Sequence, residues 1–363
     1  MKKLFLILIA TLVFSPAKAD DKALIATVYN VIIDKNITPV VAESLALSGL
    51  QAIKGVDKDF LFSDGTDKVY LYYKGKRAGL WKRPTDKKDV EGWADVTANV
   101  VKAATKSSPI ADERDFEIVD KILASAVRSL NNHSRYISGI EDEDTADNKK
   151  TRYFSERGYK DILYLRVGGF NDDTKDNIVA SLNENPNIKG LILDLRGNAG
   201  GQINVAIEVA KLFIDQGIII SVKGREGTPV KFYNASGSEI FGKPMVVLID
   251  GETASAAEVL AAALQEQAGA KLVGTQTYGK GSVQEVYSFE NDGKLSLTTA
   301  YFHTPSGKKI DAAGLMPDYC TFKVVETIRK ELKDYATLQC ARQGREDVNT
   351  DLEVAVEVLK NEF

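Results

Sequence analysis

The chain has 363 residues, and its 51 acidic and 47 basic side chains give a net charge of −4. This charge, with no long basic run, argues against nucleic acid as a partner. The only histidines, His133 and His303, have no neighbours at metal-ligand spacing, so the sequence predicts no metal and no cofactor. The length suffices for two or three packed units with a large core.

The first residues have the three parts of a secretory signal peptide. Lys2 and Lys3 form a positive start, residues 4–14 are an apolar run too short to span a bilayer, and 17–19 fit a small-x-small cleavage site. We therefore expect cleavage before Asp20 and export, to the periplasm or out of the cell. Removing 19 residues and three lysines leaves 344 residues with a net charge of −7. No later run predicts a membrane span.

Both cysteines, Cys320 and Cys340, lie in the part of the chain that we expect to be exported. Because disulfides form in oxidising compartments, one bond between them is favoured over two buried free thiols. In the chain-entropy description, closing a loop of this size stabilises the folded state by roughly 3 kcal/mol.

The region from 20 to 150 is expected to be a mostly helical N-terminal domain. Apolar residues recur at three- and four-residue spacing over 20–60 and again over 90–130. Between these stretches, two strand-like runs flank Lys74-Gly75-Lys76, which predicts a β-hairpin near 68–84. The surrounding segment 60–92 indicates no function. A charged, apolar-poor stretch at 139–160 marks the domain boundary.

From residue 151 onward the pattern alternates between strands and helices. Strand-like runs at 162–170, 188–195, 217–224, 244–250 and 271–275 alternate with helical patterns at 172–184, 204–216 and 254–267. This alternation is typical of an α/β core with a largely parallel sheet covered on both faces. An antiparallel pair follows around Asn291-Asp292-Gly293. We expect the core to span 151–325 and a helical C-terminal tail to span 326–363.

Ser255 begins the helix that follows the strand at 244–250. The sequence Ser255-Ala256-Ala257-Glu258 fits the S-x-x-E capping box, so a purely structural role competes with a catalytic one. The position also suits a nucleophile, because ligands bind where the strands of such a sheet end. The helix dipole and free N–H groups there favour developing negative charge. Ser255 is therefore our candidate nucleophile.

Lys280 is the candidate base for this serine, whose hydroxyl needs one. It lies between Gly279 and Gly281, and flanking glycines allow sharp turns and close backbone approach. Burial lowers the pKa of a lysine and so makes a neutral amine available, whereas an exposed loop lysine is the competing interpretation. Gln284 follows at the start of the next strand, where its amide is placed to orient the base.

The stretch LILDLRGNAGG, residues 191–201, is the third element of the expected site. An apolar strand ends in a glycine-rich loop, and such loops present backbone N–H groups to an anion. Together with the Ala256 N–H, the Gly200 N–H would form an oxyanion hole, in which one donor typically contributes about 3 kcal/mol. A phosphate site is the alternative, but no Lys-Ser or Lys-Thr pair follows the glycines.

The order of these motifs resembles that of the carboxyl-terminal processing (tail-specific) serine peptidases of the Ser-Lys type. The matching stretches, within residues 115–320, are LILDLRGNAGG, TASAAEVLAAALQ, GTQTYGKGSVQ, LTTAYFHTPSGKKID and GLMPD. The resemblance implies an α/β core of the ClpP/crotonase-like class that hydrolyses protein or peptide substrates through an acyl-enzyme. It also implies roles for particular residues: nucleophile Ser255, base Lys280, orienting Gln284, and oxyanion-hole amides Gly200 and Ala256.

The sequence departs from the family pattern in one large respect. The family usually carries a PDZ domain before the first core strand, but only about 25 residues separate Tyr136 from Ile162 here, too few for such a domain. Three smaller departures replace a proline and two serines, at Ala199, Thr253 and Ala257. A catalytically inert or repurposed binding protein is therefore a second hypothesis. A crotonase-like acyl-CoA enzyme is a third, which the export signal disfavours.

Overall fold

The computed structural model describes residues 20–139, 154–159, 161–237, 239–322, 340–342 and 348–362. The predicted signal peptide and most of the first half of the expected tail lie outside these residues. The described chain divides into two compact units. The first holds the described residues of Met1–Lys35, Pro39–Asp142 and Val286–Ser296, and the second holds those of Asn36–Thr38, Glu143–Glu285 and Leu297–Phe363. Residues 286–296 therefore cluster with the first unit, although the domain bounds predicted from the sequence placed them in the α/β core.

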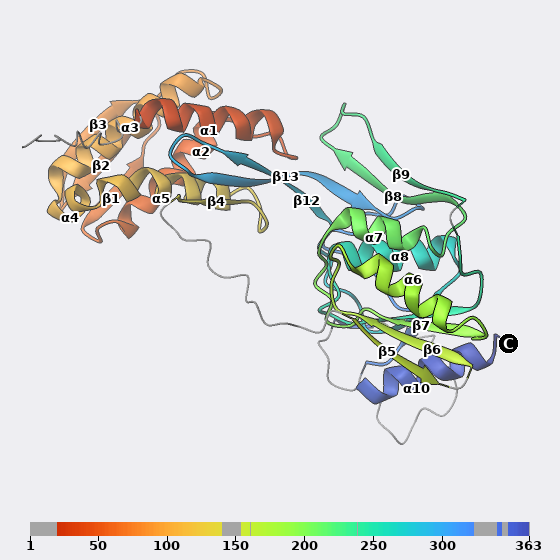
Figure 1. Cartoon of the computed structure of the whole chain (residues 1–363). Helices are drawn as coiled ribbons and strands as arrows, with labels where there is room; N and C mark the ends of the chain where they lie inside the picture. Colours follow the sequence, from red (N-terminus) through yellow and green to blue (C-terminus); the bar gives the residue numbers. More distant parts are fainter. Residues whose placement is uncertain are drawn as a thin grey trace, which may run out of the picture. The chain divides into compact units, whose positions relative to one another are not determined.

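The first unit combines helices with a three-stranded antiparallel sheet (Figure 1). The predicted hairpin is present, because β2 and β3 pair around a turn in which Lys74 and Gly75 have φ angles of 48° and 74°. A further strand, β1, pairs with β2. The elements are α1 (Asp21–Lys35), α2 (Ala42–Leu50), η1 (Gln51–Gly55), β1 (Phe60–Asp64), β2 (Lys68–Tyr73), β3 (Lys76–Lys82), α3 (Val90–Ser107), α4 (Pro109–Glu113), α5 (Asp115–Arg128) and β4 (Arg135–Ile137).

The second unit is an α/β fold built on a six-stranded sheet in the order β14-β11-β10-β7-β6-β5. Every described pairing is parallel except that of β5 with β6, which confirms the largely parallel sheet. The elements are β5 (Phe154–Tyr159), β6 (Ile162–Val167), α6 (Thr174–Glu184), β7 (Gly190–Asp194), α7 (Ile203–Ala210), β8 (Gln216–Gly224), β9 (Lys231–Ser236), β10 (Met245–Ile249), α8 (Ala256–Gln267), β11 (Lys271–Gly274), β12 (Ser282–Ser288), β13 (Lys294–His303), β14 (Tyr319–Cys320) and α10 (Val348–Lys360).

Both faces of this sheet are covered by helices. α6, α7 and α8 pack on one face, and α10, the described helix of the expected tail, packs on the other (Figure 1). In β7, Leu191 and Leu193 belong to the first hydrophobic core and Ile192 to the second. Because successive side chains of a strand point to opposite faces, a strand covered on both sides is apolar at every position.

The strand β8 is an exception to the expected single sheet. We expected it to lie in the parallel sheet, but it pairs antiparallel with β9 and β13 in a second sheet of order β12-β13-β8-β9. β9 follows β8 after a short connection, which permits an antiparallel hairpin but not a parallel crossover. β12 and β13 are neighbours around 289–293, as predicted, and contribute residues to both units.

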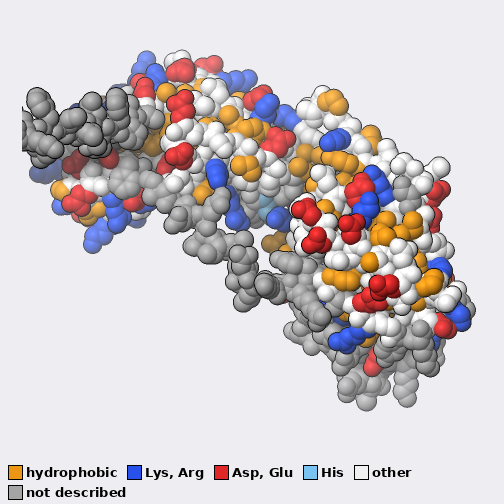
Figure 2. Space-filling model, in the orientation of Figure 1, with side chains coloured by type: hydrophobic (Ala, Val, Ile, Leu, Met, Phe, Trp, Pro, Cys, Tyr) orange, Lys and Arg blue, Asp and Glu red, His pale blue; other side chains and the backbone are white. Residues whose placement is uncertain are grey.

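Three further features of the described residues concern the surface, the helices and the cysteines. Figure 2 shows Lys and Arg side chains interspersed with Asp and Glu over the visible face. Among the described residues, no helix has the length and apolar character that crossing a membrane requires. Cys320, at the end of β14, is joined to Cys340 by a disulfide.

Candidate active site

Three loops leave the same edge of the parallel sheet, where β7, β10 and β11 end side by side. They hold the glycine-rich stretch after β7, the turn into α8 and the segment 275–281. The loops are tied to one another by backbone hydrogen bonds: Ala254 N–H donates to Asn198 O (2.9 Å) and Tyr278 N–H donates to Thr253 O (3.0 Å). The carboxyl edge of a parallel sheet is where α/β folds bind their ligands.

The turn before α8 holds Ser255 in a strained conformation. Its φ of 57° lies in the left-handed region, which costs a non-glycine residue about 1–3 kcal/mol and persists only where the surroundings enforce it. An ordinary N-cap residue has an extended backbone instead. The turn is stabilised by Asp250, whose Oδ1 accepts the N–H groups of Gly197 (3.0 Å) and Thr253 (2.9 Å). A strained strand–turn–helix serine is the geometry of a nucleophile elbow.

Glu258 joins this turn to the Lys280 loop. Its carboxylate is fully buried, and Oε2 accepts the N–H of Ser255 (2.9 Å) and the N–H of Lys280 (2.8 Å). The other oxygen, Oε1, accepts the N–H of Gly279 (2.7 Å) and the hydroxyl of Thr277 (2.5 Å). Burial raises the pKa of Glu258, and these four donors oppose the rise because they favour the carboxylate. One oxygen atom thus fixes the backbones of the candidate nucleophile and the candidate base.

The glycines beside Lys280 allow its loop to pack against the chain near 310–314. A β-carbon at Gly281 would lie only 2.2 Å from Asp311 N, and one at Gly279 would lie 3.0 Å from Gly314 N. Lys280 itself is partly buried. Within the described residues, no hydrogen bond joins Lys280 Nζ to Ser255 Oγ. Such catalytic contacts are often long in a ligand-free site.

Gln284 lies on β12, in the strand that follows the Lys280 loop. Its amide donates hydrogen bonds to the hydroxyls of Thr298 (2.8 Å) and Ser282 (3.3 Å). The two hydroxyls fix the orientation of the amide, and Thr298 is supplied by the neighbouring strand β13.

Gly200 lies directly against the Ser255 turn. A β-carbon at Gly200 would be 3.0 Å from Ser255 Cβ and 3.2 Å from Ala256 N, so a larger residue would crowd the turn. Its φ of 111° also favours glycine. The Gly200 N–H, however, donates to Asn198 Oδ1 (2.8 Å), so this predicted oxyanion donor is engaged by a side chain. Ala256 is the first residue of α8, and its N–H has no intrahelical acceptor.

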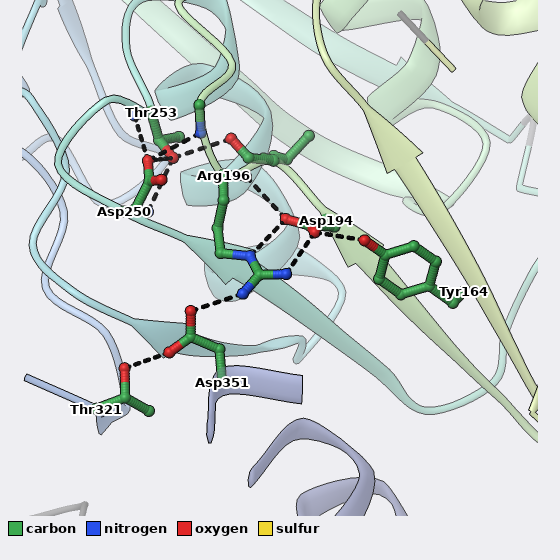
Figure 3. A network of polar contacts seen from close by, with 9 residues as sticks. Tyr164, Asp194, Arg196, Asp250, Thr253, Thr321 and Asp351 are labelled. Atoms are coloured by element: carbon green, nitrogen blue, oxygen red, sulfur yellow. Dashed lines mark hydrogen bonds and ion pairs between the residues drawn. The ribbon is translucent and has the colours of Figure 1, made fainter. Parts of the chain in front are cut away.

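A buried ionic network lies beneath the glycine-rich loop (Figure 3). The Arg196 guanidinium donates to Asp194 Oδ1 (2.9 Å) and Oδ2 (2.7 Å), and to Asp351 Oδ2 (2.8 Å) on α10. Tyr164 donates to Asp194 (2.6 Å) and Thr321 donates to Asp351 (2.5 Å). The network is a structural pairing at the strand end, and it ties the C-terminal helix to the loop that holds Gly200.

The pKa values of the two carboxylates in this network are shifted in opposite directions. Burial favours the protonated form of Asp194, but hydrogen bonds and charge from Arg196, with the Tyr164 hydroxyl, lower its pKa below the ordinary value. Burial raises the pKa of Asp351 despite the opposing contacts with Thr321 and Arg196. Within the described chain, no group of three His, Cys, Asp or Glu side chains is arranged to hold a metal ion.

Sequence reasoning missed two residues of this region. Glu258 was interpreted only as half of a capping box, and nothing in S-x-x-E shows that its carboxylate also reaches the 277–280 loop. Asp351 lies 155 residues from Arg196, and its place on a charged terminal helix gave no signal of a buried ion pair. Contacts of this kind depend on tertiary packing rather than on local pattern.

The fold and the site together define an α/β protein with a strained serine at the carboxyl edge of a parallel sheet, beside a lysine loop and a glycine-rich loop. Residues 161–321 match the model of peptidase family S41. The resemblance to carboxyl-terminal processing peptidases is thereby confirmed.

Two similar curated proteins are named as carboxy-terminal processing proteases. A carboxy-terminal-processing protease of Bartonella bacilliformis is 40% identical over 165 residues, which cover 44% of this chain and 38% of the relative. A carboxy-terminal processing protease of Bacillus subtilis is 34% identical over 214 residues, which cover 57% of this chain and 44% of the relative. The matched region thus spans less than half the length of either relative.

One solved structure matches nearly the whole chain. A lipoprotein from Streptococcus agalactiae aligns with a TM-score of 0.52 at 17% identity, covering 90% of this chain and 98% of that one. At this identity the match concerns the fold alone.

Proposed function

We propose that this chain is an exported serine endopeptidase that hydrolyses peptide bonds of protein substrates through an acyl-enzyme at Ser255. The observation that supports the proposal best is the shared Glu258 carboxylate, which holds the backbones of Ser255 and Lys280 within hydrogen-bond distance of one oxygen atom. A nucleophile and its base must start from fixed backbone positions for proton transfer between their side chains to accompany attack.

In the proposed reaction, Ser255 Oγ attacks the carbonyl carbon of the scissile peptide bond while its proton passes to the neutral amine of Lys280. The C–N bond then breaks, and Lys280 returns the proton to the leaving amine. Water repeats the sequence on the acyl-enzyme and releases the carboxylate product. Gln284 orients the lysine amine, as the third member of a triad orients a base.

The oxyanion of the tetrahedral intermediate needs donors beside Ser255. We assign the first to the Ala256 N–H, whose position at the start of α8 adds the positive end of the helix dipole. The Gly200 N–H becomes the second donor when its hydrogen bond to Asn198 Oδ1 is replaced by one to the oxyanion. The proximity of Gly200 to Ala256 N supports this pairing.

Export and substrate class belong to the same proposal. The N-terminal sequence has the three parts of a signal peptide, and the disulfide between Cys320 and Cys340 fits an oxidising compartment, the periplasm or the exterior. The curated relatives are named for carboxyl-terminal processing, so we propose protein or peptide substrates.

Replacing Ser255 by alanine tests this function. We expect Ser255→Ala to abolish cleavage of an unfolded protein substrate and to cost only about 1 kcal/mol of stability, the usual effect of losing a serine cap. Gel-based or fluorogenic cleavage assays measure the first effect, and urea unfolding measures the second. Cleavage by the folded variant at the wild-type rate would refute the nucleophile.

A further inference from the structure

Among the described residues, the three-stranded sheet of the first unit buries the side chains of one face more deeply than those of the other. The inner face buries Phe60, Phe62, Val69 and Leu71. Side chains on alternate positions point the other way and form what we call the outer face. Its apolar members are two leucines, 59% and 40% exposed, and two partly buried tyrosines: Leu61, Leu80, Tyr70 and Tyr72.

The apolar members of the outer face lie next to one another. Across the strands, Leu61 pairs with Tyr72, and Tyr70 pairs with Leu80. The two tyrosine rings stack with their centroids 6.3 Å apart. The result is a continuous apolar and aromatic surface rather than scattered exposed residues, and contiguous patches of this kind on a soluble protein mark interaction sites.

The outer face is also strongly basic. Lys68 pairs directly with Lys82 across β2 and β3, and Arg77 pairs with Tyr72. Residues 68–83 contain six basic side chains and no acidic one, although the whole chain is net negative. Three of the six, Lys68, Arg77 and Lys82, lie on the outer face by this register. Among the described residues, Arg77 and Lys82 form no ion pair, and Lys68 Nζ lies 4.0 Å from Asp67. Like charges directly opposite in a sheet are destabilising, and an anionic group between them would relieve this repulsion.

We propose that the outer face of the β1–β3 sheet is a docking surface for an extended, acidic polypeptide segment. Same-side residues along β2 repeat every two positions, the spacing at which an extended peptide presents its own side chains. Carboxylates of such a peptide would meet Lys68, Arg77 and Lys82, and its aliphatic side chains would cover the two leucines. A nucleic acid matches the cations and the tyrosines but offers nothing aliphatic to Leu61 and Leu80.

The inference concerns binding, so it is tested separately from the proposed catalysis. The probe is a fluorescein-labelled peptide of about twelve residues in which glutamate alternates with valine or leucine. Its binding to the full chain carrying Ser255→Ala, which keeps the probe intact, is followed by fluorescence anisotropy. We expect saturable binding with a Kd on the order of 10–100 µM, weakened by added salt.

Matched variants locate the binding site. Lys82→Glu on the outer face, and separately Leu61→Ser with Leu80→Ser, should each weaken binding about tenfold. Lys106→Glu makes the same charge change on an exposed position of α3 and should alter the Kd by less than about twofold. Circular dichroism verifies that each variant is folded.

Four results would overturn the inference. Three of them are equal weakening by Lys82→Glu and Lys106→Glu, tighter binding of a single-stranded oligonucleotide of the same charge, and no saturable binding of the acidic peptide below the millimolar range. Binding of a control peptide with lysine in place of glutamate at equal strength would also contradict it, because the basic face would then have no role.

Discussion

Two buried polar clusters lie at the same edge of the parallel sheet and are built in opposite ways. In the Glu258 cluster, backbone N–H groups and a hydroxyl donate hydrogen bonds to one carboxylate. All of these donors lie within 22 residues of Glu258 in the sequence. The Arg196 cluster joins charged side chains, one of which, Asp351, comes from the far end of the chain. The first fixes the positions of two reactive residues, and the second fastens a helix to the sheet.

The difference indicates which cluster serves chemistry and which serves stability. A carboxylate surrounded by backbone donors holds main-chain atoms within tenths of an ångström, which is what a nucleophile and its base require. A buried ion pair is weak evidence for net stability, yet breaking it is costly because one charge remains unpaired. Loss of Glu258 should therefore affect activity most, and loss of Asp351 should affect unfolding most.

Glu258→Gln is expected to have the largest effect. Glutamine offers one acceptor oxygen and a donor amide to a site that contains four donors, so two of them lose their acceptor. The Ser255 turn and the Lys280 loop then separate, and a shift of about 1 Å in reacting groups costs roughly 100-fold in kcat. Steady-state kinetics on a peptide substrate measure this loss.

The control for Glu258→Gln is Glu266→Gln on the same helix. Glu266 accepts hydrogen bonds from the backbone and the hydroxyl of Ser306, outside the site. The Glu266→Gln variant should therefore retain near wild-type kcat. Similar losses in the two variants would show that α8 as a whole, rather than the shared carboxylate, is responsible.

Glu258 is expected to contribute to the acid side of the activity profile, in addition to the protonation of Lys280 that the mechanism itself implies. Because burial raises its pKa above the ordinary 4.5, protonation begins at a higher pH than for an exposed glutamate. The protonated acid cannot accept all four donors, so kcat should fall as the pH drops toward this raised value. An activity profile that stays flat well below pH 4.5 would contradict the role of the carboxylate.

Asp351→Asn should act on stability instead. It removes one of the two negative partners of Arg196, and breaking a buried ion pair costs about 3 kcal/mol. At a temperature where the variant is folded, kcat should fall by less than about tenfold. Urea unfolding and kinetics measured together make the comparison, with Glu357→Gln, on an exposed position of α10, as the control. If Asp351→Asn lost as much kcat as Glu258→Gln, the proposal that only the Glu258 cluster serves catalysis would be contradicted.

Tyr164→Phe is the mildest test. The variant loses a hydrogen bond to the Asp194 carboxylate, worth about 1.5 kcal/mol at neutral pH. Asp194 has a lowered folded pKa, so its stabilising effect is present above its ordinary value of 3.8 and is lost as the pH falls below it. Without the Tyr164 donor this pKa moves up toward 3.8. The stability gap between wild type and variant should therefore shrink between pH 7 and pH 3, and a constant gap would contradict the linkage.

The sequence predicted features that depend on local pattern. The parallel strands were evident as fully apolar runs, and the hairpin at 68–84 was evident from Lys74-Gly75 between strand-like stretches. The glycines at 279 and 281 indicated a close approach that the structure bears out against Asp311 and Gly314. Each of these follows from residues adjacent in the chain.

What the sequence could not predict depends on packing between distant segments. β8 alternates with helices just as the parallel strands do, and only its short connection to β9 places it in another sheet. The Asn198 amide that engages Gly200 N–H is determined by loop geometry. The partnership of Arg196 with Asp351 required α10 to fold back on the sheet.

The central claim is that Ser255 is a nucleophile activated by Lys280, and covalent labelling with a fluorophosphonate probe tests it most directly. Intact-mass measurement and peptide mapping should find one adduct on wild type, at Ser255, and none on Ser255→Ala. Lys280→Arg keeps the charge but cannot lose its proton, so it should label at least 100-fold more slowly. An adduct at another residue, or labelling of Lys280→Arg at the wild-type rate, would contradict the account.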